Sequence, residues 1–152
     1  MHPLRIVLAL TGLTLLLTAA PAEARSAGHG TRLALGLGAD YLVDPEMGEF
    51  QLTLALEKPI THGLTMGARF GALLIPETDD VGAPIDFRLR LRTHGLYIDG
   101  LVGPWLVFDS GDTLRFHGAF GFGFLAGSAS FGLEVGWLDD TGLIGLRAAF
   151  SL

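Results

Sequence analysis

Three arginines at every second position have the clearest capacity for chemistry in this 152-residue chain. Arg88, Arg90 and Arg92 are separated by single leucines, and alternate side chains of a strand share one face. Guanidinium groups bind carboxylates and phosphates through paired hydrogen bonds. The spacing therefore predicts either a network of ion pairs or a narrow path for anions.

Carboxylates occupy matching positions in the neighbouring segments. We expect the three arginines to pair with Asp99 and to share their site with Arg69 and Glu57. The full predicted network consists of Asp40, Glu57, Arg69, Asp86, Arg88, Arg90, Arg92, Asp99, Arg115, Glu134 and Arg147. Because a buried charge is costly unless it is paired, the near balance of signs predicts a polar plug. A narrow, arginine-lined channel is the alternative.

Covalent catalysis would depend on Ser110 and His117, with Asp109 and Asp112 close by. A nucleophile within reach of a base can support acyl transfer. However, His117 falls on the same alternate face as the arginines, whereas the apolar face contains no Ser or His. A lipid substrate would approach the apolar face, so we expect no catalysis and keep a lipid-modifying enzyme as a further alternative.

Metal and cofactor chemistry are not indicated by the residue types. The chain has no cysteine, and none of its histidines are paired at the spacing that metal ligands require. We therefore expect no metal and no cofactor. We also expect no nucleic-acid partner for a chain of net charge −6.

The elements that would position these side chains are eight segments of alternating polarity. We predict strands at 32–43, 49–58, 64–73, 84–93, 96–107, 113–125, 131–138 and 143–152. None of the 39 apolar-face positions in them carries a charge, although charged residues make up 17% of the chain. Since alternate residues of a strand lie on opposite faces, this pattern predicts an all-β fold. We expect an eight-stranded antiparallel up-and-down transmembrane barrel with its apolar face toward lipid.

The opposite face has residues that suit the inside of a narrow barrel. Nearly half of its positions are Gly or Ala, and we expect the bulky residues to lie on the apolar face. An eight-stranded barrel has an interior that side chains just fill. The small residues would therefore make room for the charged network.

Residues 1–24 have the features of a secretory signal peptide. His2 and Arg5 precede an apolar run over 6–18, and Ala22 and Ala24 occupy the −3 and −1 positions of a cleavage site. The run is shorter than the ~20 residues that span a bilayer. We expect a cleaved signal peptide at 1–24 and an outer-membrane β-barrel domain at 25–152, beginning at Arg25.

Charge separates between two sets of predicted connections. The second, fourth and sixth hold Lys58, His62 and His94 without an acid. The first, third, fifth and seventh, with their edges, hold ten acids and no Lys or Arg: Asp44, Glu46, Glu49, Glu77, Asp79, Asp80, Asp109, Asp112, Asp139 and Asp140. An even strand number places the two sets at opposite ends, with the acidic set outside the cell. These acids either bind divalent cations that bridge to lipid phosphates or solvate the loops.

Aromatic residues fall near the predicted strand ends. The outer set is Tyr41, Phe50, Phe108 and Trp137, and the periplasmic set is Phe124, Phe131 and Phe150. Aromatic rings favour the headgroup level of a bilayer, so we predict two aromatic belts.

Residues 31–152 resemble the small eight-stranded bacterial outer-membrane barrels in architecture. The most specific part is the last strand, 145–152, with the sequence GLRAAFSL. It is similar to the C-terminal signal read by the barrel-assembly machinery, which usually ends in an aromatic residue. Here Leu152 is last and Phe150 is third from the end.

The resemblance implies a place in the Gram-negative cell envelope. We expect a monomeric, structural or envelope-integrity protein of the outer membrane. Its partners would be outer-membrane lipids, lipopolysaccharide and, during insertion, the barrel-assembly machinery. A narrow, porin-like channel and a lipid A-modifying enzyme are the alternatives, in that order.

Overall fold

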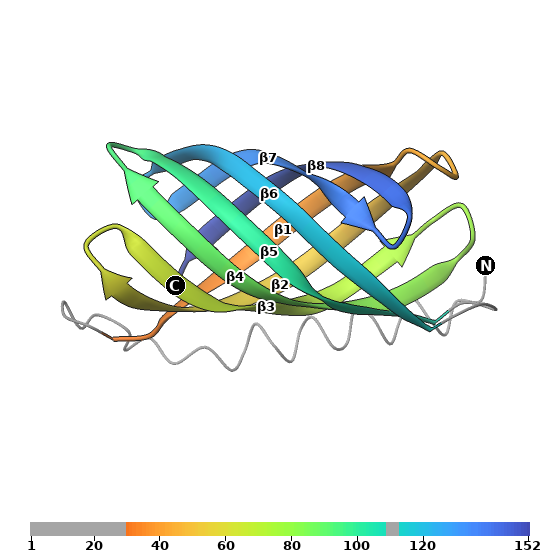
Figure 1. Ribbon diagram of the computed structural model, residues 1–152, viewed down its shortest axis with the longest axis horizontal. Coiled ribbons are helices and arrows are strands. Elements are labelled where there is room, and N and C mark those ends of the chain that lie inside the picture. Colours follow the sequence, from red (N-terminus) through yellow and green to blue (C-terminus); the bar gives the residue numbers. More distant parts are fainter. Residues whose placement is uncertain (1–29, 109–112) are drawn as a thin grey trace.

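The alternating segments form a closed antiparallel barrel in the computed structural model, which describes residues 30–108 and 113–152 (Figure 1). The strands are β1 (Arg32–Leu42), β2 (Met47–Thr61), β3 (Leu64–Ile75), β4 (Asp80–Thr93), β5 (Leu96–Phe108), β6 (Leu114–Ala126), β7 (Ala129–Leu138) and β8 (Thr141–Ser151). Each strand pairs with the next in sequence, and β8 returns to pair with β1. The predicted all-β, eight-stranded barrel is confirmed.

The strands differ from the predicted ones by at most four residues at any end. The largest difference is at β4, which begins at Asp80 rather than at 84, so that the turn before it is shorter than expected. Strand β2 also runs on to Thr61, although Pro59 favours a turn. A register shift between Pro59 and Thr61 accommodates the proline within the β2–β3 pair, as β-bulges do elsewhere.

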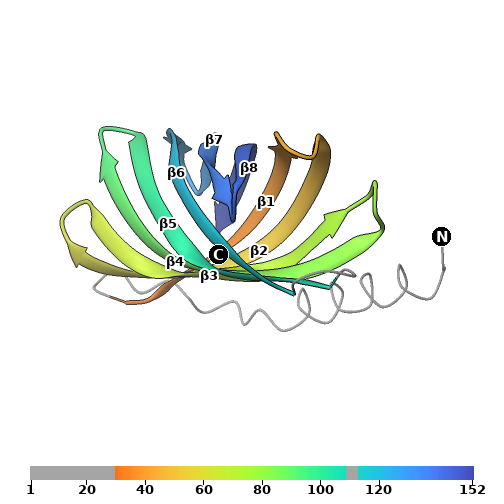
Figure 2. The same ribbon diagram turned by 45° about the vertical axis from the view of Figure 1, so that its right-hand side comes forward.

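Both described ends of the chain lie at one end of the barrel, which we call the terminal end (Figure 1). Its turns are the two-residue connections 62–63, 94–95 and 127–128, each with a glycine at positive φ. The opposite, or far, end carries the turns 43–46, 76–79 and 139–140. Figure 2 shows the hairpins spreading from the middle of the barrel toward both ends.

The outward face is apolar along the described strands. Among the residues that the structure describes, 31 large hydrophobic side chains are exposed, for example Phe120 at 66% and Leu146 at 64%. No helix within 30–108 and 113–152 is long and apolar enough to cross a membrane.

The inward face contains bulky residues, although we expected the bulky residues to lie on the apolar face. A buried apolar cluster, here called the apolar plug, fills the far end of the interior: Leu42, Leu73, Ile75, Trp105, Val107, Leu138 and Leu143. Its members come from the far ends of β1, β3, β5, β7 and β8. The expectation of small or charged inward residues was therefore wrong at this end. An eight-stranded interior must be filled to exclude water, and apolar side chains fill it where no charge partners are available.

The predicted signal peptide at 1–24 and the cleavage site before Arg25 lie outside the described residues, as do Asp109, Ser110 and Asp112.

Candidate functional site

The candidate site is the set of charged side chains that fills the barrel interior. It divides into two groups. The arginine cluster consists of Glu57, Arg88, Arg90, Arg92 and Asp99 and lies toward the terminal end. The histidine cluster consists of Asp40, Glu49, Gln51, Arg69, Asp86, Trp105, His117, Glu134 and Arg147 and lies nearer the far end.

In the arginine cluster, each carboxylate accepts from more than one guanidinium group. Asp99 receives Arg88 Nη2 at 2.5 Å and Arg90 Nε at 2.6 Å. Glu57 receives Arg88 Nη1 at 3.1 Å and Arg92 Nη2 at 2.5 Å. The Arg90 guanidinium also lies 4.0 Å from the centre of the Tyr97 ring, in cation–π geometry. Arg90 Nη1 also lies 3.7 Å from Glu57, so each carboxylate pairs with at least two arginines.

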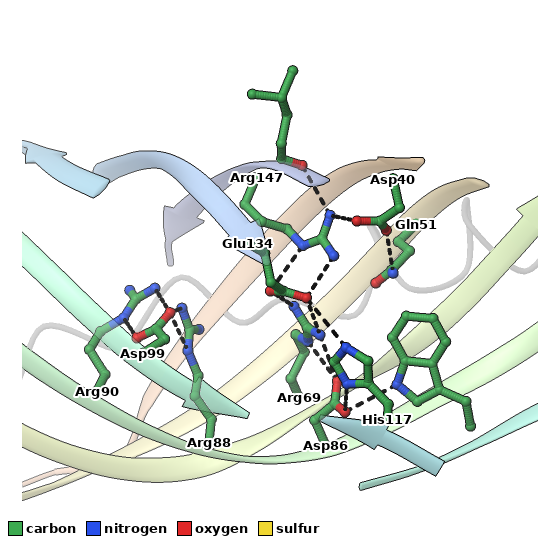
Figure 3. Close-up of polar contacts among 12 residues, drawn as sticks. Asp40, Gln51, Arg69, Asp86, Arg88, Arg90, Asp99, His117, Glu134 and Arg147 are labelled. Atoms are coloured by element: carbon green, nitrogen blue, oxygen red, sulfur yellow. Dashed lines mark hydrogen bonds and ion pairs between the residues drawn. The ribbon is translucent and has the colours of Figure 1, made fainter. Parts of the chain in front are cut away.

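The histidine cluster is organised around Arg69, which bridges two strands on opposite walls (Figure 3). Arg69 of β3 donates to Asp86 of β4 at 2.7 Å and to Glu134 of β7 at 2.8 Å. Strands β3 and β7 are not neighbours in the barrel, so the Arg69–Glu134 pair crosses the lumen. All three side chains are almost completely buried, with at most 6% exposed.

His117 and Trp105 complete this cluster beside Asp86. His117 Nδ1 lies 2.7 Å from Asp86 Oδ1, and Trp105 Nε1 donates to the same oxygen at 3.1 Å. The two rings stack with centroids 4.3 Å apart. His117 is fully buried, which confirms the inward position expected of it. This arrangement links the charged network to the apolar plug, because Trp105 belongs to both.

Arg147 connects Glu134 to Asp40, which belongs to a set of polar side chains on β1 and β2. Its Nη2 lies 2.8 Å from Glu134 and its Nη1 lies 2.6 Å from Asp40. Gln51 Nε2 donates to both Asp40 and Glu49, at 2.7 and 2.8 Å. Asp40 and Glu49 face each other in the β1–β2 register, so the Gln51 amide lies between two carboxyl groups.

Glycines opposite the charged residues leave the space that these contacts need. Gly145 pairs with Asp40 in the register, and a Cβ at this position would lie 1.8 Å from Asp40 Oδ1. Gly38 pairs with Arg147, and a Cβ there would lie 2.7 Å from its Nη1. The expected role of the small inward residues therefore holds at these two positions.

The interior leaves little free space between the two clusters. A cavity of about 30 Å³ is lined by side chains of both, including Arg69, Arg88, Asp99 and Glu134. This volume is sufficient for roughly two water molecules.

Several predicted positions require correction. Arg92 pairs with Glu57 rather than Asp99, and Arg69 belongs to the histidine cluster instead of sharing the Asp99 site. The cause is register, because Arg69 lies opposite Asp86 in the β3–β4 pair. Glu49 is an interior residue with 1% of its surface exposed, not an acid of the outer rim, since β2 begins two residues earlier than predicted.

Other predicted residues lie where their parity placed them. Arg115 is half-buried and pairs with the buried Trp105 in the β5–β6 register. The seven aromatic residues predicted to form belts are all exposed on the outer face: Tyr41, Phe50, Phe108, Phe124, Phe131, Trp137 and Phe150. Three of them form a row at the terminal end, in which Phe131 contacts Phe124 and Phe150 at centroid distances of 5.9 and 6.4 Å.

Trp105 and Gln51 are site residues that were not included in the predicted network, although Gln51 was expected on the inward face. Trp105 continues the inward parity of Gly103, and its indole N–H is a donor that a buried carboxylate can use. The same parity, continued two residues beyond Gly103, could have identified it. Among the residues that the structure describes, no group of three or more His, Asp or Glu side chains is arranged to hold a metal ion.

Comparisons with known proteins bear on the fold. No protein-family model and no curated protein sequence matches the chain. A structure described as "De novo design of transmembrane beta-barrels" is similar, with a TM-score of 0.61 and 10% sequence identity, covering 80% of this chain and 95% of that one. The NMR structure of the de novo designed TMB2.3 gives a TM-score of 0.56 and 13% identity, covering 84% and 98%.

The fold matches that of designed transmembrane β-barrels. At these identities the likeness concerns the fold alone. Together with the exposed apolar outer face, it indicates a membrane location.

Proposed function

We propose that this chain is an integral outer-membrane protein with a structural, envelope-integrity role and no catalytic activity. The observation that carries the proposal is the Arg69–Glu134 ion pair across the lumen, with a donor–acceptor distance of 2.8 Å. An interior closed by such a contact, with the apolar plug beyond it, favours a rigid closed barrel over an open pore.

The membrane location follows from length and polarity. Every strand has ten or more residues, which matches the 9–11 residues that cross a bilayer when tilted. The aromatic residues near both ends are suited to two headgroup layers. We place the terminal end in the periplasm, because short turns face that compartment in bacterial outer-membrane barrels.

The proposed partners follow from the same placement. Outer-membrane lipids contact the apolar face, and the far-end acids face lipopolysaccharide. The barrel-assembly machinery inserts the chain, which functions as a monomer. Within the described residues, acidic side chains at the far end also stabilise turns, since Glu77 accepts from the Gly48 N–H at 3.0 Å and Asp139 from the Phe116 N–H at 2.7 Å.

The first test is fractionation of inner and outer membranes, followed by gel electrophoresis of boiled and unboiled samples. We expect the protein in the outer-membrane fraction with a mobility that changes on heating. A measured mass that corresponds to a mature chain beginning at Arg25 would support cleavage of the predicted signal peptide. A soluble protein without a mobility shift would contradict the proposal.

The second test separates a closed barrel from a channel. The folded protein is reconstituted in a planar bilayer, and we expect no steady conductance. A stable conductance that falls in the Arg90→Ala variant would instead support an anion path through the arginine cluster. An altered lipid A profile in cells that produce the protein would contradict the absence of catalysis, and loss of that change in His117→Ala would support an enzyme.

A further inference from the structure

The terminal mouth of the barrel contains an open cavity of about 380 Å³. It is formed by the start of β1, the β2–β3 hairpin and the end of β4, and its lining includes Arg32, Ile60, Thr61, His62 and Arg92. Of the described residues, no acid lines this cavity. A solvent-accessible cavity with two guanidinium groups and an imidazole is an environment that favours anions.

The local charge balance points in the same direction. Arg32 stands beside the arginine cluster, opposite Glu57 in the β1–β2 register. Apart from the outward-facing Lys58, the described arginines at this end are Arg32, Arg88, Arg90 and Arg92, and the interior carboxylates that face them are Glu57 and Asp99. Four positive and two negative charges leave an excess of two positive charges, although the whole chain has a net charge of −6.

Arg92, which lines this cavity, has unused hydrogen-bonding capacity. Its Nη2 is engaged by Glu57 at 2.5 Å, but its buried Nε–H has no hydrogen-bond partner among the described residues. Leaving a buried charged donor unsatisfied is costly. A ligand oxygen that accepts from Arg92 would remove that cost.

We propose that the terminal mouth is a binding site for a phosphate-type anion, held by Arg32 and Arg92. Tetrahedral phosphoryl oxygens accept hydrogen bonds from two converging guanidinium groups, and Thr61 and His62 add donors on the hairpin wall. Both inorganic phosphate and a lipid headgroup carry this chemistry. Ile60, which is 48% exposed at the cavity, offers an apolar surface to the first carbons of a lipid.

The test is a titration of the barrel, folded in an uncharged detergent, with inorganic phosphate, followed by NMR of the backbone amides and the arginine Nε–H groups. We expect the chemical shifts of the backbone amides of residues 60–63 and of the Arg92 Nε–H to change and to saturate as phosphate is added. The variant Arg32→Gln changes an exposed residue outside the interior ion pairs, and we expect it to weaken binding by about tenfold. The variant Arg92→Gln should have a similar or larger effect.

Lys58→Gln is the matched control, because it removes the same charge at the same end from an outward-facing side chain. We expect it to leave the affinity nearly unchanged. Equal weakening by Lys58→Gln and Arg32→Gln would show attraction by overall charge only and would overturn the site. No saturable shift with up to ~50 mM phosphate, far above the range of specific anion sites, would also overturn it.

A second titration identifies the source of the phosphate group. Phosphatidylglycerol with short acyl chains is added below its micellar concentration. Binding about tenfold tighter than that of inorganic phosphate, and sensitive to Arg32→Gln, would support a lipid headgroup. Equal affinities would support a free phosphate. Tight lipid binding that neither arginine variant weakens would overturn the proposal.

Discussion

The two charge clusters inside the barrel differ in the ratio of arginines to carboxylates. In the arginine cluster, three guanidinium groups share two carboxylates, so each carboxylate keeps a partner if one arginine is lost. In the histidine cluster, Arg69 and Arg147 pair with Asp40, Asp86 and Glu134, whereas Glu49 accepts a hydrogen bond from Gln51. Here the carboxylates outnumber the arginines, and the neutral donors of Gln51 and Trp105 supply the remaining contacts.

At each end of the barrel, the excess charge of the interior has the same sign as the charged residues of the turns. The terminal end has an excess of arginine inside and Lys58, His62 and His94 at its hairpins. The far half has an excess of carboxylates inside and acids in its described turns. Positive and negative charge are therefore separated along the barrel axis. Only in the far half do the carboxylates outnumber the arginines.

The largest expected effect is the loss of Arg69. The variant Arg69→Met leaves Asp86 without an arginine partner and Glu134 with Arg147 alone, and breaking a buried ion pair costs about 3–5 kcal/mol. Arg88→Met should cost only about 1–2 kcal/mol, because Asp99 keeps Arg90 and Glu57 keeps Arg92. The measurement is the free energy of urea unfolding of the barrel inserted in vesicles. The folded fraction at each urea concentration is read from the heat-dependent mobility on a gel. Equal losses for the two variants would remove the distinction between the clusters.

A smaller effect is expected from filling the space beside Asp40. In Gly145→Ala, the new methyl group would lie 1.8 Å from Asp40 Oδ1, and displacement of a carboxylate held by Arg147 and Gln51 should cost about 1–3 kcal/mol. The control is Gly100→Ala, where no atom lies within 4 Å of the added Cβ. We expect it to change stability by less than about 0.5 kcal/mol. The same unfolding assay measures both, and a stable Gly145→Ala barrel would argue against tight packing of the histidine cluster.

Trp105→Phe tests the link between the histidine cluster and the apolar plug. It removes the indole N–H that donates to Asp86 while keeping a ring to stack on His117. We expect a loss of about 1 kcal/mol in the unfolding free energy. Trp137→Phe, on the outward face, is the control and should have less effect. A larger loss of unfolding free energy in Trp137→Phe than in Trp105→Phe would mean that the outward-facing tryptophan stabilises the barrel more than the contact between Trp105 and Asp86.

Salt should have the smallest effect of all. The paired side chains of both clusters are at most 13% exposed, except Arg92 at 21%, and buried pairs are screened little. Raising NaCl from about 0.05 to 0.5 M should leave the wild-type midpoint of urea unfolding almost unchanged. A marked fall in the midpoint would mean that solvent ions enter the interior, and it would favour the channel over the closed barrel.

Much of the site could be predicted from inward parity. Asp40, Glu57, Asp86, Asp99 and Glu134 are all buried, as the alternation required. Two residues near strand ends were misassigned: Glu49, the first residue of the predicted strand 49–58, was counted with the outer acids, and Trp105, inside the predicted strand 96–107, was not included in the network. Strand ends are the least certain part of a sequence-based assignment, and in this chain two site residues stand there.

The sequence by itself determined the number of strands, the order in which they pair and the face on which each side chain lies. These properties depend on a two-residue period and on short connections, which are local. The tertiary structure alone decided which charges meet. Arg147 reaches Asp40 because β8 closes on β1, and Arg69 reaches Glu134 across the lumen. Such contacts depend on the register and diameter of the closed barrel, which are fixed only when all eight strands are paired.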